Sequence, residues 1–196
     1  MTTANNRHSQ YDIDPMFLQR WSPRAFDGQP MPKEDLLAIL DAAHWAPSAS
    51  NSQPWRFVYA QRNTAEFDRM LGLLIDFNQD WAKAASALVF VFSQKLATAD
   101  DGSLSKPIRN HSFDTGTAWG YLALQSLKSG YFAHGMTGVH FERVSAELAA
   151  PEEYHFEAAV AIGRLGNKDD LSEKLREREI PNNRKPLSEI AFEGSF

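Results

Sequence analysis

The chain has 196 residues, of which 43% are hydrophobic, and a formal net charge of -5 at pH 7. This length fits one domain with a sizeable core, and the negative balance argues against general nucleic-acid binding, which needs a basic face. Cysteine is absent, which excludes disulfides, thiolate metal sites and a cysteine nucleophile.

The N-terminal residues carry no signal for export. MTTANNRHSQ lacks the apolar segment of a secretory signal, and the longest strongly apolar run, residues 87–92, is too short to span a bilayer. We therefore expect a cytoplasmic protein with no membrane partner. The polar residues 1–15 are predicted to form a flexible tail before a single domain over residues 16–196.

Helix and strand patterns alternate along the first half. Apolar positions 36, 37, 39, 40 and 43 predict a helix over 32–45 with Pro32 in its first turn, and residues 55–60 are predicted to form a strand. The spacing predicts a helix over 63–77, where Asn63 and Glu66 resemble a capping box. Residues 87–92 are predicted to be a buried strand, and 94–110 a long loop that could cover a site.

The longest helix in the second half is predicted over residues 113–129. Asp114 is its candidate cap and Gly130 its candidate end. This helix is apolar on more than one face, so it must be buried on both sides. A central core helix of a monomer and a contact with a second subunit, which Gly116 and Gly120 would allow, are equally compatible with the pattern.

The last third is predicted to contain short elements. They are a helix over 142–149, a strand over 156–162 that ends in a turn at 163–166, a charged helix over 170–179 and a last strand near 190–192. The irregular alternation of helices and strands favours an α+β fold with one mixed sheet.

Motifs for phosphate loops, serine hydrolases and zinc proteases are absent from the sequence, and no pair of histidines has helical metal-ligand spacing. We therefore expect no metal site and no nucleophile of the protein's own. An enzyme with this sequence would depend on a cofactor for its reactivity.

Two groups of polar residues suit a cofactor. Arginine donors match phosphate oxygens, and hydroxyls and amides match a ribityl chain and the edge of a heteroaromatic ring. The first group is Arg20, Arg24, Arg184 and Lys185, and the second is Ser48, Ser50, Asn51, Gln53 and Asn78. FMN combines these features and is one of several options. On composition alone, an ordinary helix-to-strand connection is the better explanation of residues 46–57.

Several segments resemble the nitroreductase family of FMN-dependent oxidoreductases. They are RWSPRAF (20–26), APSASNSQPWRF (46–57), FNQDWAKAASALVFVF (77–92), DTGTAWGYLALQSLKSGYFAHGMTGV (114–139), AAVAIGRLG (158–166) and RKPLSEI (184–190). The resemblance implies a three-layer α+β sandwich, with one mixed, mainly antiparallel sheet flanked by helices. It also implies a domain-swapped homodimer with an FMN in each of two clefts between the subunits.

The resemblance implies a set of FMN-binding residues and no catalytic side chain, because flavin N5 is the reactive group. Residues 47–51 would reach the flavin from the second subunit, and the backbone at Thr137 and Gly138 would face N5. The whole set is Arg20, Trp21, Ser22, Arg24, Pro47, Ser48, Ala49, Ser50, Asn51, Gln53, Asn78, Met136, Thr137, Gly138, Gly163, Arg184 and Lys185.

The implied activity is hydride transfer from NADH or NADPH, through flavin N5, to a small acceptor such as a nitroaromatic, quinone or enone in a ping-pong cycle. The sequence departs from relatives at Trp81, where many carry a lysine beside flavin N1 and O2, and at Thr137, where some carry glutamate. One alternative is a flavin-binding or storage protein without turnover, in which Trp81 and residues 94–110 cover the flavin. A third possibility is a globular dimer without a ligand.

Overall fold

A four-stranded antiparallel sheet forms the centre of the computed structural model, which describes residues 2–98 and 103–196. The strands lie in the order β3 (Trp55–Gln61), β4 (Ala87–Gln94), β8 (Tyr154–Gly163) and β7 (Phe132–Met136). The α+β fold and the mainly antiparallel sheet are confirmed. Every strand pair described in this sheet is antiparallel, so the expected mixture of directions is not found among the described residues.

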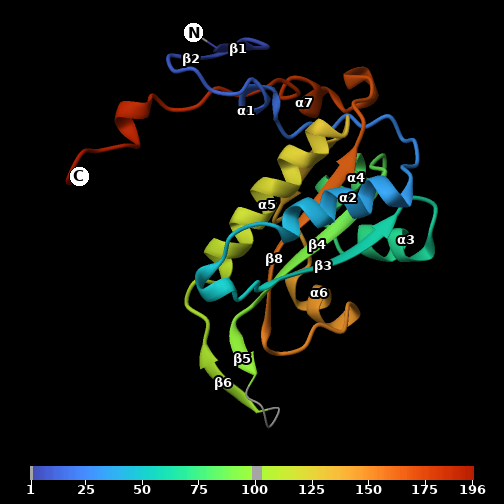
Figure 1. Cartoon of the computed structure of the whole chain (residues 1–196). Coiled ribbons are helices and arrows are strands. Elements are labelled where there is room, and N and C mark those ends of the chain that lie inside the picture. The colour runs from blue at the N-terminus through green and yellow to red at the C-terminus, as the bar shows by residue number, and fades with distance from the viewer. Residues whose placement is uncertain (1, 99–102) are drawn as a thin grey trace.

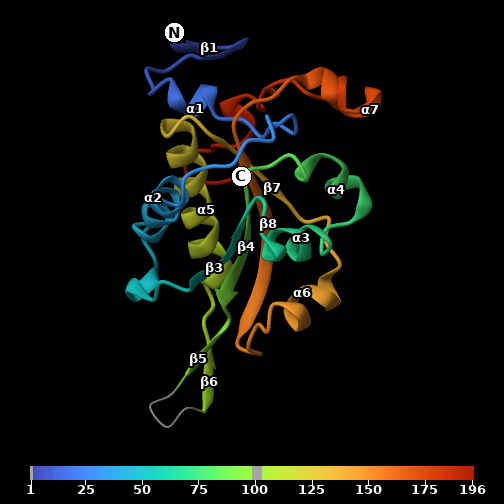
Figure 2. The same cartoon turned by 90° about the vertical axis from the view of Figure 1, so that its right-hand side faces the viewer.

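Helices cover both faces of the sheet, which gives three layers (Figure 1). Figure 2 shows α2 (Lys33–His44) and α5 (His111–Lys128) on one side and α3 (Ala65–Leu71), α4 (Asp76–Ala82) and α6 (Phe141–Glu147) on the other. Strand β4 supplies both cores, because Val89 packs with α2 and α5 while Phe90 packs with α3 and α4. Burial on both faces explains its uninterrupted apolar sequence.

The predicted helix over 32–45 is confirmed as α2, but the predicted helix over 63–77 is wrong. The chain forms α3 and α4 instead, and between them the buried Leu73 and Leu74 occupy a turn. The cap of α3 is Thr64, whose hydroxyl accepts a hydrogen bond from the N–H of Phe67 at 3.2 Å. Asn63 precedes the cap with a φ of 67°, so the cap lies one residue later than proposed. Phe67 stands where a capping box needs Glu or Gln, so the proposed capping box is absent.

Helix α5 confirms the longest predicted helix, and Gly130 ends it with a φ of +80°. The assignment of Asp114 as its cap is wrong, because Asn110 occupies that position and Asp114 lies within the first turn. Asp114 is 4% exposed, and its carboxylate accepts the N–H of Ala49 at 3.0 Å. It therefore ties α5 to the connection that follows α2.

The segment expected to be a loop at 94–110 contains β5 (Leu96–Thr98) and β6 (Leu104–Pro107), which pair antiparallel. Residues 99–102 of that segment lie outside the described residues. Within the expected tail, β1 (Thr2–Ala4) and β2 (Arg7–Ser9) pair as a hairpin before α1 (Met16–Gln19). The sequence did not predict these strands, and the domain boundary after residue 15 stays a prediction.

The C-terminal region is less regular than expected. The helix predicted over 170–179 is only α7 (Glu173–Arg176), preceded by the 3-10 turn η2 (Lys168–Asp170). Residues 190–192 are not a strand, and a 3-10 turn, η3 (Leu187–Glu189), lies just before them. Residues 182–196 are all exposed and run away from the body of the molecule in Figure 1. None of the described strands pairs with this C-terminal arm, and a segment without a pairing partner does not form a stable strand.

Candidate functional site

A cavity of about 810 Å³ lies between α5 and strands β7 and β8. Seven of the residues expected from the sequence line it: Arg20, Ser22, Arg24, Asn78, Met136, Thr137 and Gly138. They come from three separate parts of the chain, at 20–24, 78 and 136–138. The fold therefore brings expected residues that are far apart in the sequence into one cavity.

A smaller cavity of about 220 Å³ adjoins the first, since Arg20, Ser22, Arg24 and His134 line both. Five arginines lie on its walls: Arg7, Arg20, Arg24, Arg178 and Arg184. Trp21, expected from the sequence, also lines it. Arg7 and Arg178 were missed by the sequence analysis, because a lone arginine in a polar tail or a charged helix is normally a solvated surface residue.

The arginines of this smaller cavity are held close to one another and partly out of water. Burial, and then the neighbouring Arg184 and Arg7, lower the pKa of Arg20. Burial, and then Arg178, lower the pKa of Arg24, against the opposing effect of Glu179. The buried Nε atoms of Arg7 and Arg24 have no hydrogen-bond partner within the described residues. Such clustered, incompletely paired donors favour a bound anion.

Backbone contacts hold the arginine-bearing segment in place. Glu179 is 8% exposed, and its Oε1 accepts the N–H groups of Arg24 at 2.7 Å and Ala25 at 2.8 Å. Arg7 donates to the carbonyls of Leu18 at 3.1 Å and Arg20 at 2.8 Å. Residues from both ends of the chain thus fix the positions of Arg20 and Arg24.

His134 lies on β7 and lines both cavities together with Arg20 and Arg24. Burial, with a smaller contribution from Arg24, lowers the pKa of His134 to about 4, and its Nδ1 lies 2.9 Å from the carbonyl of Pro23. The ring is therefore neutral at pH 7, with Nδ1–H as the donor. Trp81 stacks on His134 at a ring distance of 4.6 Å, is 2% exposed and does not line the cavity. Its buried position gives no support to the alternative in which Trp81 covers the flavin.

Asn78 and Gly138 line the larger cavity at a point where the segment after β7 approaches the start of α4 closely. The carbonyl of Gly138 accepts hydrogen bonds from the side-chain amide of Asn78 and from the N–H of Ile75, both at 3.0 Å. A Cβ at position 138 would lie 2.9 Å from Cδ1 of Ile75 and collide with the amide of Asn78. Only glycine allows this contact between the second residue after β7 and the start of α4.

Other expected residues lie outside both cavities: Pro47, Ser48, Ala49, Ser50, Asn51, Gln53, Gly163 and Lys185. Gly163 packs against the ring of Phe26, where an added Cβ would approach Cδ1 to 2.7 Å. Ser50, Asn51 and Gln53 have positive φ values of 52°, 55° and 47° in the connection after α2. A role for residues 47–51 in a site formed with a second subunit stays a prediction.

The sequence analysis missed the contribution of α5 to the cavity. Thr115, Trp119 and Ala123 line it together with Gly116 and Gly120. A Cβ at either glycine would have nothing within 4 Å, so the helix surface is open there. The second apolar face of the predicted helix indicated that this face contacts something, but periodicity alone does not distinguish a cavity wall from a packed core.

Among residues 2–98 and 103–196, no group of three or more His, Asp or Glu side chains is arranged to hold a metal ion. In the same part of the chain, no helix has the length and apolar character required to cross a membrane.

This chain is similar in sequence and in structure to known proteins. Residues 17–76 match the model of the nitroreductase family. A crystal structure described as an oxidoreductase containing FMN is 54% identical and has a TM-score of 0.97, over 100% of this chain and 98% of that chain. A nitroreductase family protein from Clostridium difficile 630 has a TM-score of 0.69 at 22% identity, over 92% and 97% of the two chains, and shows the shared fold.

Curated relatives match over shorter regions. The major NAD(P)H-flavin oxidoreductase of Aliivibrio fischeri is 33% identical over 87 residues, which cover 42% of this chain and 39% of the relative. The chain spans only 40% and 36% of the length of the first two curated relatives it matches. The family model, the full-length structural match and the position of the cavity agree with one another, and the chain belongs to the nitroreductase family.

Proposed function

We propose that this protein is an FMN-dependent oxidoreductase that transfers hydride from NADH or NADPH to a small acceptor in the cytoplasm. The observation that carries the proposal is that five arginines line the smaller cavity, which adjoins the larger, mostly apolar cavity. A ligand with an anionic end and a flat heteroaromatic body is complementary to this pair of cavities. The FMN named in the description of the 54% identical structure is such a ligand.

The residues present fit FMN. The unpaired Nε atoms of Arg7 and Arg24 are donors available near a phosphate in the smaller cavity. The buried hydroxyl of Thr115, which has no partner within the described residues, belongs to a residue that lines the larger cavity. Arg20, Arg24 and Arg184 would hold the phosphate, and Asn78 and the backbone of Thr137 and Gly138 would contact the ring edge. When bound, FMN would supply the hydride-transfer chemistry at N5, and the protein would bind and orient the reactants.

We further propose that the active form is a homodimer. The C-terminal arm is exposed along its length, with Ile190 at 61% and Phe192 at 49% exposure, and α5 presents Phe113 at 78% exposure. Exposed apolar groups on an arm and on a long helix are typical of surfaces buried by a second copy. Residues 47–51 of one subunit would then complete the site of the other, as the resemblance implies.

The proposal is tested by the visible spectrum of the purified protein, followed by anaerobic addition of NADH and then NADPH. Yellow protein that is bleached by one of these nucleotides supports the oxidoreductase and identifies its donor. Yellow protein that neither nucleotide bleaches contradicts the proposal that NADH or NADPH is the electron donor. Colourless protein that does not bind added FMN refutes the whole proposal.

A further inference from the structure

A cluster of polar residues lies at the end of the large cavity opposite the arginines. His134, beside the arginines, pairs with Ala161 on β8, whereas Glu157 lies further along the same strand. At about 3.3 Å per residue, Ala161 and Glu157 are roughly 13 Å apart. Glu157 is the single carboxylate among the described residues that line this cavity. The two ends of the cavity therefore differ in the sign of their charge.

A β-bulge directs the carboxylate of Glu157 into the cavity. Val91 on β4 pairs with Ala158, but the next residue, Phe92, pairs with Phe156, so Glu157 is the extra residue on β8. Phe156 packs into the core on the opposite face, while Glu157 and Ala158 both line the cavity. Bulges of this kind redirect a side chain and are frequent next to functional sites.

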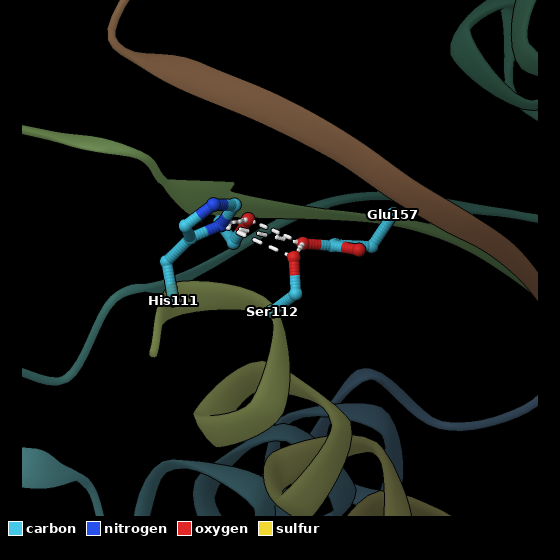
Figure 3. A network of polar contacts seen from close by, with 4 residues as sticks. His111, Ser112 and Glu157 are labelled. Atoms are coloured by element: carbon cyan, nitrogen blue, oxygen red, sulfur yellow. Dashed lines mark hydrogen bonds and ion pairs between the residues drawn. The ribbon is translucent and has the colours of Figure 1, made fainter. Parts of the chain in front are cut away.

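Two serine hydroxyls from other elements donate to one oxygen of this carboxylate, and His111 supports one of the two. Ser93 of β4 and Ser112 of α5 donate to Oε1 of Glu157 at 2.5 Å and 2.6 Å, as Figure 3 shows for Ser112. Nδ1 of His111 lies 2.7 Å from the Ser93 hydroxyl and 3.6 Å from Oε1. Because both serine protons go to Glu157, Nδ1 of His111 is the donor to Ser93.

This arrangement differs from a hydrolytic triad. The carboxylate contacts the serine hydroxyls rather than orienting the second ring nitrogen of the histidine, and Ser93 is 0% exposed. A serine without access to the cavity cannot attack a substrate, so nucleophilic catalysis is excluded for Ser93. All the contacts instead fix Glu157 in one position.

The second oxygen of Glu157 is left for a ligand. Within the described residues it has no hydrogen-bond partner, and in Figure 3 it lies on the side of the carboxylate away from His111 and Ser112. The side chain of Glu157 is 22% exposed. A carboxylate accepts but does not donate hydrogen bonds, and one that is already immobilised loses little entropy when it binds a cationic donor.

We propose that Glu157 determines acceptor specificity, by binding a protonated amine or a comparable donor group on an aromatic or unsaturated acceptor. This inference rests on the proposed function, since the acceptor would occupy the part of the cavity that FMN leaves open. Ser93, Ser112 and His111 are positioning residues that act through Glu157. Acceptors with a cationic group are expected to bind about tenfold more tightly than neutral analogues of the same shape.

The test uses the FMN-loaded, oxidised protein and two probes of similar shape, benzylammonium and benzyl alcohol. Their dissociation constants are measured from the perturbation of the flavin spectrum at low salt and at 0.5 M salt, so no turnover is required. Unaltered protein is expected to prefer benzylammonium about tenfold at low salt and less at high salt. Glu157→Gln should abolish the preference, and Glu157→Asp should retain part of it, because only Asp keeps the charge.

Glu153→Gln, one residue before β8 and outside the cavity lining, is the matched control and should keep the preference. Equal binding of the two probes by the unaltered protein, or an unchanged preference in Glu157→Gln, would overturn the inference. If the protein does not bind FMN, the proposed function fails separately. The dissociation constants of the same two probes are then measured by calorimetric titration into the flavin-free protein. A preference for benzylammonium that Glu157→Gln abolishes supports the inference, and equal binding or an unchanged preference overturns it.

Discussion

Removal of the Glu179 carboxylate is expected to weaken both the fold and the arginine cluster. Its Oε1 accepts the N–H groups of Arg24 and Ala25, and the residue is 8% exposed. Glu179→Ala leaves two buried donors without an acceptor, at about 1–3 kcal/mol each, so the free energy of unfolding should fall by about 2–6 kcal/mol. Glu179→Gln keeps an oxygen but loses the charge, which should cost about 1 kcal/mol per hydrogen bond, or about 2 kcal/mol in all.

The assay is urea unfolding followed by tryptophan fluorescence, with the nearby exposed Glu177→Gln as the control. The expected order of stability is the parent and Glu177→Gln, then Glu179→Gln, then Glu179→Ala. The FMN dissociation constant of Glu179→Gln should also rise, because the segment that carries Arg24 is held less firmly. A Glu179→Ala variant within about 0.5 kcal/mol of the parent would refute the reasoning, because buried N–H groups do not lose their acceptors at so small a cost.

Three further predictions follow from the site. Arg24→Ala should weaken FMN binding by about 1.5–3 kcal/mol, through loss of a charge-assisted contact, and an unchanged dissociation constant in a fluorescence titration would reject this assignment. Because the pKa of His134 is about 4 when folded and 6.5 when unfolded, the folded state binds its proton more weakly and stability falls as the pH drops from 6.5 towards 4. Between pH 6.5 and 5 the loss is about 1.6 kcal/mol, and urea unfolding of His134→Asn should lack this component; equal pH dependence in both proteins would contradict it. Gly138→Ala should lower the melting temperature and FMN affinity, because the added Cβ collides with Ile75 and Asn78, whereas Gly72→Ala, with its nearest contact at 3.4 Å, should change the melting temperature less. Equal shifts in a thermal melt would argue against the collision.

Local sequence patterns predicted most of the elements that form the core. The apolar run at 87–92 became β4, and the helices predicted at 32–45 and 113–129 became α2 and α5. These predictions succeeded because burial on one or both faces imposes a period that is visible within a single segment. The α+β fold and the motif at Arg20–Arg24 could therefore be identified before the structure was known.

Only the tertiary structure decided which distant residues meet. The break between α3 and α4 arises where the chain turns to pair Ile75 with Gly138, a partner 63 residues away that no local pattern contains. Asp114 looked like a helix cap, but the fold uses it to hold Ala49. The bulge at Glu157 likewise depends on the register between β4 and β8.

The sequence by itself determined the periodic elements and the residue types able to bind a phosphate and a flavin, because propensity, periodicity and donor chemistry belong to short segments. The tertiary structure alone decided that Arg7 and Arg178 join the arginine cluster, that Trp81 lies in the core rather than in the cavity, and that Glu157 faces the opposite end. The physical reason is that burial and charge at a site depend on long-range packing, which becomes fixed only when helices, strands and both chain ends are assembled.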